Sequence, residues 1–262
     1  MAAALPTWAV LAAAFAGGRG FAGRIRNFGI LDIFWGYGFL VAVVLAAALG
    51  SGWGPRRLVL AGIVAVWSLR LGTHVLIRVA RAHPNEDPRY GQWRQAWGRK
   101  FSGRMTGFFQ LQAASVVLLA VPFYVAAANP APALAPLEFV GAALALAGTA
   151  GEATADWQLA AFNRGRRAPA SVGQRGLWRY SRHPNYFFEL FTWLGFAAFA
   201  WDSPGGAWGL VSPAVILYFL LGVTGIPMTE RQSVASKGES FRRYQRTTSP
   251  FVPWPVRPAG RP

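Results

Sequence analysis

The chain contains no cysteine, and only 14% of its 262 residues carry charge. The absence of cysteine excludes disulfides, thiolate nucleophiles, iron–sulfur clusters and cysteine-based zinc sites. Charged residues make up about 25% of a typical soluble domain, so this chain has too few for a fully solvated surface. Only three histidines are present, and because they are not clustered the sequence predicts no metal site.

Apolar and aromatic residues are abundant, since 53% of the chain is hydrophobic and it contains 12 Trp and 19 Phe. The formal net charge of +16 would suit a nucleic acid partner. The basic residues, however, stand in blocks between apolar runs. The excess of basic residues in cytoplasmic loops of membrane proteins explains that arrangement, so no nucleic acid partner is expected.

A helix that crosses a bilayer needs about 20 apolar residues. The sequence therefore predicts an all-α, polytopic membrane helical bundle with about seven transmembrane helices, and a kink at Pro122 in the fourth. The expected spans are residues 5–16, 28–49, 58–79, 107–128, 134–162, 186–201 and 208–226.

The connections between these spans alternate in charge. Residues 78–106, 163–185 and the tail from 228 carry seven, six and seven Lys or Arg, whereas residues 129–136 and 202–207 carry none. The positive-inside rule then places the N-terminus outside and the C-terminus in the cytoplasm.

Ionisable groups at membrane depth are costly and often functional. Asp32 stands near the cytoplasmic start of the second span. In an apolar pocket an aspartate can stay protonated at neutral pH and stabilise a developing enolate by donating a hydrogen bond. The alternative is an interfacial helix-start aspartate that accepts backbone N–H groups.

Two further pairs share helix faces, because their members are one turn apart. Arg70 and His74 lie within the third span. Arg70 must meet an anion or a water-filled cavity there, and the alternative is a purely structural ion pair. For His74 the alternative to an acid–base role is a histidine buried in the core with its hydrogen bonds satisfied. Glu152 and Asp156 lie on the fifth span. Two carboxylates at this spacing suit a ribose diol or ion pairs with the basic residues that follow.

The most informative segment is residues 176–189, GLWRYSRHPNYFFE. Arg179, Arg182 and His183 precede a helix start at Pro184, and a helix N-terminus with adjacent arginines is an anion site. A solvated basic loop would explain the arginines, but it would not explain why Glu189 enters a short apolar span.

Several motifs together resemble the bacterial branch of the steroid 5α-reductase family, over nearly the whole chain after Asn27. They are Asp32-Ile33-Phe34-Trp35-Gly36, Arg70-Leu71, Glu86-Asp87-Pro88-Arg89-Tyr90, Asp156-Trp157-Gln158, residues 176–189, and Tyr244-Gln245-Arg246-Thr247-Thr248-Ser249-Pro250-Phe251-Val252-Pro253-Trp254. The Arg-His-Pro element is shared with integral-membrane isoprenylcysteine and phospholipid methyltransferases.

This resemblance implies a seven-span reductase of a bacterial inner membrane, active as a single domain over residues 1–262. Residues 27–128 would hold the substrate pocket and residues 134–254 the cofactor half. NADPH would bind on the cytoplasmic side, and hydride would reach the β-carbon of a conjugated enone. The matching cofactor-binding positions are Arg70, Arg81, Asp156, Arg179, Tyr180, His183, Asn185, Glu189 and Tyr244.

The implied substrate is a lipophilic, steroid-like or isoprenoid-like enone. Membrane lipid is the other expected partner. The sequence does not give the oligomeric state, and a monomer is favoured. The family's animal members hold the steroid ketone with a Gln-Glu pair and a tyrosine, but no Glu precedes Glu86 here. The matching region instead offers Asp32 as the catalytic acid. Phe34, Trp35 and Trp67 would line the substrate slot.

Two other classes of protein are considered. A membrane methyltransferase could use the Arg-His-Pro element and a glutamate to hold S-adenosylmethionine. A lipid-binding or transport protein would be expected to show inverted repeats with broken helices, and the sequence shows no such symmetry.

Overall fold

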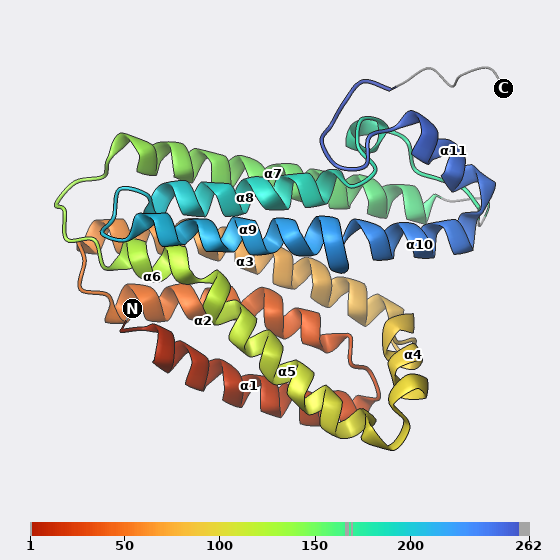
Figure 1. Cartoon of the computed structure of the whole chain (residues 1–262), viewed down its shortest axis with the longest axis horizontal. Coiled ribbons are helices and arrows are strands. Elements are labelled where there is room, and N and C mark those ends of the chain that lie inside the picture. Colours follow the sequence, from red (N-terminus) through yellow and green to blue (C-terminus); the bar gives the residue numbers. More distant parts are fainter. Residues whose placement is uncertain (1, 166–167, 169, 257–262) are drawn as a thin grey trace. The chain divides into compact units, whose positions relative to one another are not determined.

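The computed structural model describes residues 2–165, 168 and 170–256, and this part of the chain is all-helical (Figure 1). The predicted all-α class is therefore confirmed. The α-helices are α1 Ala4–Ile25, α2 Ile30–Leu49, α3 Gly54–Ala82, α4 Pro88–Trp97, α5 Phe101–Leu119, α6 Val121–Ala127, α7 Pro136–Arg164, α8 Pro184–Ala200, α9 Val211–Tyr218, α10 Ile226–Lys237 and α11 Glu239–Thr247.

Four helical stretches are long and apolar enough to cross a membrane, namely Ile30–Leu49, Gly54–Ala82, Pro88–Ala127 and Gly206–Lys237. Large apolar side chains on them are exposed, among them Leu58 at 72% and Leu111 at 63%. Such faces suit lipid rather than water, so the chain is a multi-pass membrane protein. Within the described residues, α1, α7 and α8 do not meet the same criteria of length and composition.

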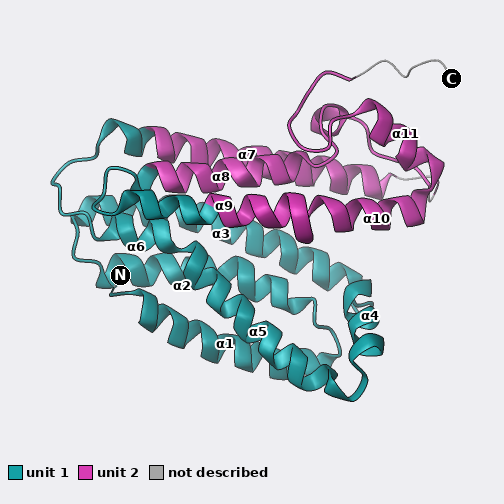
Figure 2. Ribbon diagram, in the orientation of Figure 1, with its two compact units in different colours: residues 1–139, 199–212 teal, residues 140–198, 213–262 magenta. Residues whose placement is uncertain are grey.

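The chain divides into two compact units (Figure 2). Unit 1 comprises residues 1–139 and 199–212, and unit 2 comprises residues 140–198 and 213–262. The halves expected at residues 27–128 and 134–254 are defined by substrate and cofactor binding, not by compactness. They therefore stay a prediction.

Helices α2 and α3 of unit 1 approach closely through glycine. A Cβ atom on Gly36 would lie 3.0 Å from the Cα atom of Gly72. Between the same helices the hydroxyl of Ser68 donates to the carbonyl of Gly36 at 2.6 Å and accepts the N–H of Leu40 at 3.0 Å. Small residues and hydroxyl hydrogen bonds are typical of helix packing in membranes.

The kink expected at Pro122 is a break between two helices. α5 ends at Leu119, and α6 begins at Val121 with Pro122 in its first turn, where the missing N–H of proline costs nothing. Ala120 forms the junction, because its N–H donates to the carbonyl of Val116 and its carbonyl accepts the N–H of Phe123, both at 2.9 Å.

The connections on one end of unit 1 are tied together by Arg56. Its guanidinium is 1% exposed, forms an ion pair with Glu138 at 2.6 Å and donates to the carbonyls of Asn129 at 2.9 Å and Ala131 at 2.7 Å. The side chain of Asn129 in turn donates to the hydroxyl of Ser203 at 3.2 Å. The connections around residues 50–57, 129–136 and 202–207 therefore meet at one end of this unit.

Three glycines in α1, at positions 18, 20 and 23, have the GxGxxG spacing of dinucleotide-binding loops. That motif functions as a tight turn between a strand and a helix. Here the glycines lie inside the helix Ala4–Ile25, so they form no phosphate loop.

In unit 2, α7 and α8 pack through small residues in the same way. A Cβ atom on Gly148 would lie 2.5 Å from the hydroxyl oxygen of Thr192, and one on Gly195 would meet the backbone of Ala145. These contacts hold α8 against the middle of α7, where Gly148 lies one and two turns before Glu152 and Asp156.

Candidate functional site

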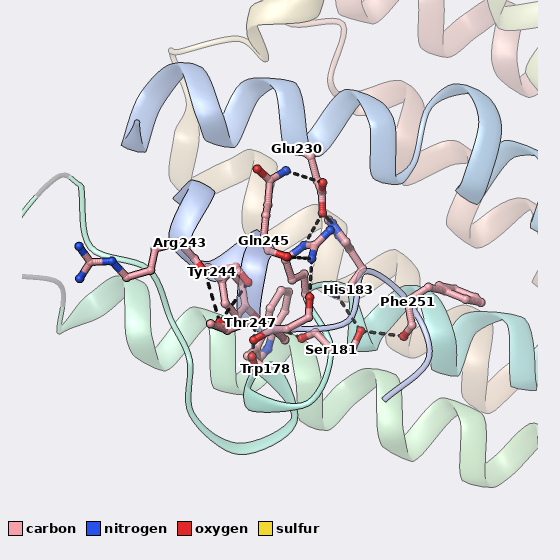
Figure 3. A network of polar contacts seen from close by, with 11 residues as sticks. Trp178, Ser181, His183, Glu230, Arg243, Tyr244, Gln245, Thr247 and Phe251 are labelled. Carbon is pink, nitrogen blue, oxygen red and sulfur yellow. Dashed lines mark hydrogen bonds and ion pairs between the residues drawn. The ribbon is translucent and has the colours of Figure 1, made fainter. Parts of the chain in front are cut away.

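A polar network in unit 2 is centred on Glu230 of α10 (Figure 3). Its carboxylate accepts from Arg182 Nε at 2.6 Å and from Gln245 Nε2 at 2.7 Å, and it lies 3.3 Å from His183 Nε2. Arg182 and His183 precede α8, and Gln245 belongs to α11. Glu230 therefore joins three elements, and its side chain is only 14% exposed.

Tyr244 fixes the loop in front of α8 from the other side. Its hydroxyl donates to the carbonyls of Trp178 and Ser181, the latter at 3.1 Å. Burial raises the pKa of Tyr244 against the opposing effect of the Arg182 charge. The phenol is therefore a stable hydrogen-bond donor at physiological pH.

Residues 248–256, here named the C-terminal strap, run beside this loop. Ser181 and Ser249 form an isolated parallel bridge. The contacts are Arg182 N–H to Ser249 O at 2.8 Å, Trp254 N–H to Tyr180 O at 2.9 Å, and Ser181 hydroxyl to Phe251 O at 2.7 Å. The loop is therefore held on both sides, by the strap and by Tyr244.

The start of the loop is set by a glycine. Gly176 has a φ of 60°, a left-handed conformation that glycine adopts without steric cost. Gln158 of α7 accepts the N–H of Leu177 at 2.9 Å. Beyond this turn Arg179 is exposed and lies 6.0 Å from the ring of Tyr180, which is 43% exposed.

The predicted carboxylates of α7 are buried, with Glu152 4% and Asp156 8% exposed. Asn185, in the first turn of α8, donates from Nδ2 to Asp156 Oδ1 at 3.3 Å. Its other atom, Oδ1, is buried and has no hydrogen-bond partner among the described residues. A buried amide oxygen without a donor is costly, so this position suits a ligand hydroxyl. Glu189 lies one helical turn further along α8.

The remaining predicted cofactor residues, Arg70 and Arg81, lie on α3 in unit 1. Arg70 is half-buried, as is His74 one turn later, and Arg81 is exposed. The structure therefore brings Asp156, Asn185 and the loop residues together in unit 2. Whether Arg70 and Arg81 join them stays a prediction.

Asp32, the predicted catalytic acid, lies in unit 1 between two arginines. Arg78 Nη2 and Arg89 Nη2 each lie 3.4 Å from its Oδ2, and its side chain is 28% exposed. Arg89 is itself held by Asp87 at 3.1 Å. These ion pairs are typical of an ionised carboxylate, so the neutral-acid role stays a prediction.

Asp87 also starts α4. Its Oδ1 accepts the N–H of Arg89 at 2.9 Å, and Pro88 follows as the first helical residue, a combination typical of helix starts. Burial opposes ionisation of Asp87, but hydrogen bonds from Arg89 outweigh it and lower the pKa of the carboxyl group.

Of the aromatic residues predicted to line the substrate slot, Trp67 lies in the core of unit 1, whereas Phe34 and Trp35 are half-buried. Trp67 is fully buried and packs on Phe39, with ring centroids 5.0 Å apart. Trp35 packs edge-on against the same Phe39 at 4.8 Å and donates from Nε1 to the Ser115 hydroxyl at 3.1 Å. Phe34 packs on Phe15 of α1, at 5.8 Å. Their role in substrate binding stays a prediction.

Comparison with known proteins gives one family match. A family described as "Protein of unknown function (DUF1295)" matches residues 21–248. The chain belongs to this family. No curated protein and no solved structure matches the chain.

This DUF1295 protein contains two functional candidates that the sequence analysis did not identify. Glu230 is separated from Arg182 by 48 residues, and only the tertiary structure joins them. Arg89 belongs to the motif Glu86-Asp87-Pro88-Arg89-Tyr90, but the motif does not predict its contact with Asp32, which is 57 residues away. The signal available in the sequence was the scarcity of acidic residues, since a buried arginine requires a carboxylate or several carbonyls as partners.

Proposed function

We propose that this protein is an NADPH-dependent reductase of a lipophilic α,β-unsaturated carbonyl compound, similar to the steroid 5α-reductase family. The observation that carries the proposal is the Asp156–Asn185 hydrogen bond beside the arginine-bearing loop, together with the buried amide oxygen of Asn185, which has no partner among the described residues. The order of the motifs along the chain supports the same family.

The residues of unit 2 fit the polar part of a dinucleotide. Asp156 is a hydroxyl acceptor, and Asn185 Oδ1 is a second acceptor already buried beside it. Arg179 is exposed at the turn before α8, where it can reach a phosphate by charge-assisted hydrogen bonds. Bound NADPH would supply the hydride.

In this proposal Asp32 acts on the substrate carbonyl. Arg78 and Arg89 hold its carboxyl group from one side, which restricts its rotamers. A protonated Asp32 would donate a hydrogen bond to the carbonyl oxygen and stabilise the enolate that forms when hydride adds to the β-carbon. If Asp32→Asn kept full turnover, this role would be wrong.

The proposed topology is seven spans, with the N-terminus outside and the C-terminus in the cytoplasm of a bacterial inner membrane. The meeting of residues 50–57, 129–136 and 202–207 at one end of unit 1 supports it, because all three belong on the outer side. Arg56 and Arg57 do not oppose it. Arg56 is neutralised by Glu138, and Arg57 donates to the carbonyl of Gly50 at 2.9 Å.

The deciding assay combines purified protein, NADPH and a panel of lipophilic enones. Cofactor oxidation and a product mass gain of two hydrogens are the expected result. We expect Asn185→Ala to weaken NADPH binding about tenfold, the order of one buried hydrogen bond. Asn163→Ala is the matched control, because Asn163 is exposed near the end of α7. Equal effects of the two variants would contradict the assignment of Asn185.

A membrane methyltransferase is the second candidate, favoured by the Arg-His-Pro element and its contact with Glu230. A ligand that binds the folded state raises its apparent stability. Thermal-shift titrations with NADPH and with S-adenosylmethionine therefore separate the two functions. Stabilisation by S-adenosylmethionine alone would replace the reductase proposal with the methyltransferase.

A further inference from the structure

Unit 2 contains a pocket that none of the predicted dinucleotide-binding residues lines, within the part of the chain described. It has a volume of about 400 Å³ and lies between the end of α11 and the C-terminal strap. Its wall includes Arg182, Gln245, Arg246, Thr248, Ser249 and Trp254.

The charged side chains among the described lining residues are both cations, Arg182 and Arg246. Arg182 is 8% exposed. Its Nε contacts Glu230, and its Nη1 donates to the carbonyls of Gln245, at 3.0 Å, and Thr248. Its Nη2 makes no hydrogen bond to any residue that the structure describes. A fixed guanidinium at the pocket wall therefore keeps one donor group for a ligand.

The second cation is held only loosely. Arg246 pairs with Glu239 at 2.5 Å, but the two side chains are 61% and 60% exposed, and exposed ion pairs contribute little. Arg246 can therefore exchange this partner for an anion in the pocket. No hydrogen bond of the Thr248 or Ser249 hydroxyl group to a described residue is present, so these hydroxyls add two more donors.

The wall also contains apolar residues. Trp254 is 62% exposed although it lines the pocket, and Val252 is 51% exposed. An exposed indole beside two guanidinium groups suits a ligand with a phosphate at one end and a flat or apolar group at the other. The volume is sufficient for a small organic ligand.

We propose that this pocket is a binding site for an organic phosphate ester, with the phosphate on Arg182 and Arg246 and the remainder against Trp254. Soluble nucleotides and phospholipid headgroups share this chemistry. The site is distinct from Asp156 and Asn185, so it does not depend on the proposed reductase activity.

The test uses the full-length protein in detergent micelles, with adenosine monophosphate as the probe and adenosine as the control ligand. Saturable binding of the monophosphate, at least tenfold tighter than that of adenosine, is expected. Arg246→Ala should weaken it at least fivefold and Arg246→Lys less. Asn185→Ala should leave the Arg246-dependent part of this binding unchanged, which separates this site from the proposed dinucleotide site.

Arg243→Ala is the matched charge control. Arg243 lies on the same helix, and its side chain points away from the network (Figure 3). Thermal melts of each variant confirm folding. Equal loss of binding in Arg243→Ala and Arg246→Ala, or equal affinity for adenosine, would overturn the proposal in favour of diffuse charge attraction.

A second arm identifies the natural source of the phosphate. The same titration is made in nanodiscs of phosphatidylcholine alone or with phosphatidylglycerol. Competition by phosphatidylglycerol that depends on Arg246 assigns the pocket to lipid headgroups, and unchanged affinity assigns it to soluble phosphates; both results support the pocket. Absence of saturable binding in micelles and in both nanodiscs would contradict it.

Discussion

Glu230 is one of only 10 acidic residues in the chain, and donors from the loop before α8 and from α11 converge on it. Arg182 beside it is largely buried, so its charge depends on this carboxylate and on backbone carbonyls. Removing one partner of a buried ion pair leaves the other charge uncompensated, which costs more than the pair contributes.

Glu230→Ala should therefore lower the free energy of unfolding by about 3 kcal/mol or more, measured by denaturant titration in micelles. Glu239→Ala is the control, because Glu239 pairs with Arg246 at the exposed surface and its loss should leave the unfolding midpoint unchanged. Similar effects of the two substitutions would show that Glu230 acts only as a surface charge.

The raised pKa of Tyr244 predicts that the folded protein loses stability at alkaline pH. Its pKa in the folded state is raised above the unfolded value of about 10. The neutral phenol therefore stabilises the fold fully below pH 10, and this stabilisation is lost as the pH rises through the folded-state pKa. Wild-type protein should lose stability above pH 10 more steeply than Tyr244→Phe, in melts recorded against pH. Parallel curves would exclude a contribution from this phenol.

At the scale of elements, close helix packing depends on glycines, because a Cβ atom at these positions would collide with the neighbouring helix. The fit of α7 against α8 is an example, because the Cβ of an alanine at position 148 would lie 2.6 Å from the backbone nitrogen of Thr192. Backbone cannot move aside as a flexible side chain can, so the helices would have to separate.

Gly148→Ala should destabilise the protein by about 1–3 kcal/mol, the usual cost of overpacking. Gly62→Ala is the matched control, because no atom lies within 4 Å of its added Cβ. In the helix α3 this change should be neutral or stabilising by up to about 1 kcal/mol. Thermal melts of both variants measure the difference, and a neutral Gly148→Ala would contradict the close approach.

At the scale of the whole molecule, the absence of cysteine makes the proposed topology directly measurable. Single cysteines can be placed at Pro132, Arg99 and Arg243, which are exposed in three different connections. A membrane-impermeant maleimide should label Pro132→Cys in intact cells, and the other two only after lysis. Labelling of Arg99→Cys in intact cells would reverse the orientation.

The sequence by itself determined the helical class and the membrane location, because both follow from local composition: long apolar runs and few charges. It also located the start of α8, because Pro184 and the apolar run after it mark the beginning of a helix. The clustered arginines directly precede this start. The break at Pro122 was predictable for the same local reason.

Only the tertiary structure decided which polar groups meet. The Glu230–Arg182 pair, the Asp32–Arg89 pair and the C-terminal strap join residues that are 48 or more positions apart. The pattern of apolar residues determines which face of each helix is apolar, but it does not determine which other helix packs there. With 26 basic and 10 acidic residues, many pairings are possible for each carboxylate, and close packing at positions such as Gly36 and Gly148 selects among them.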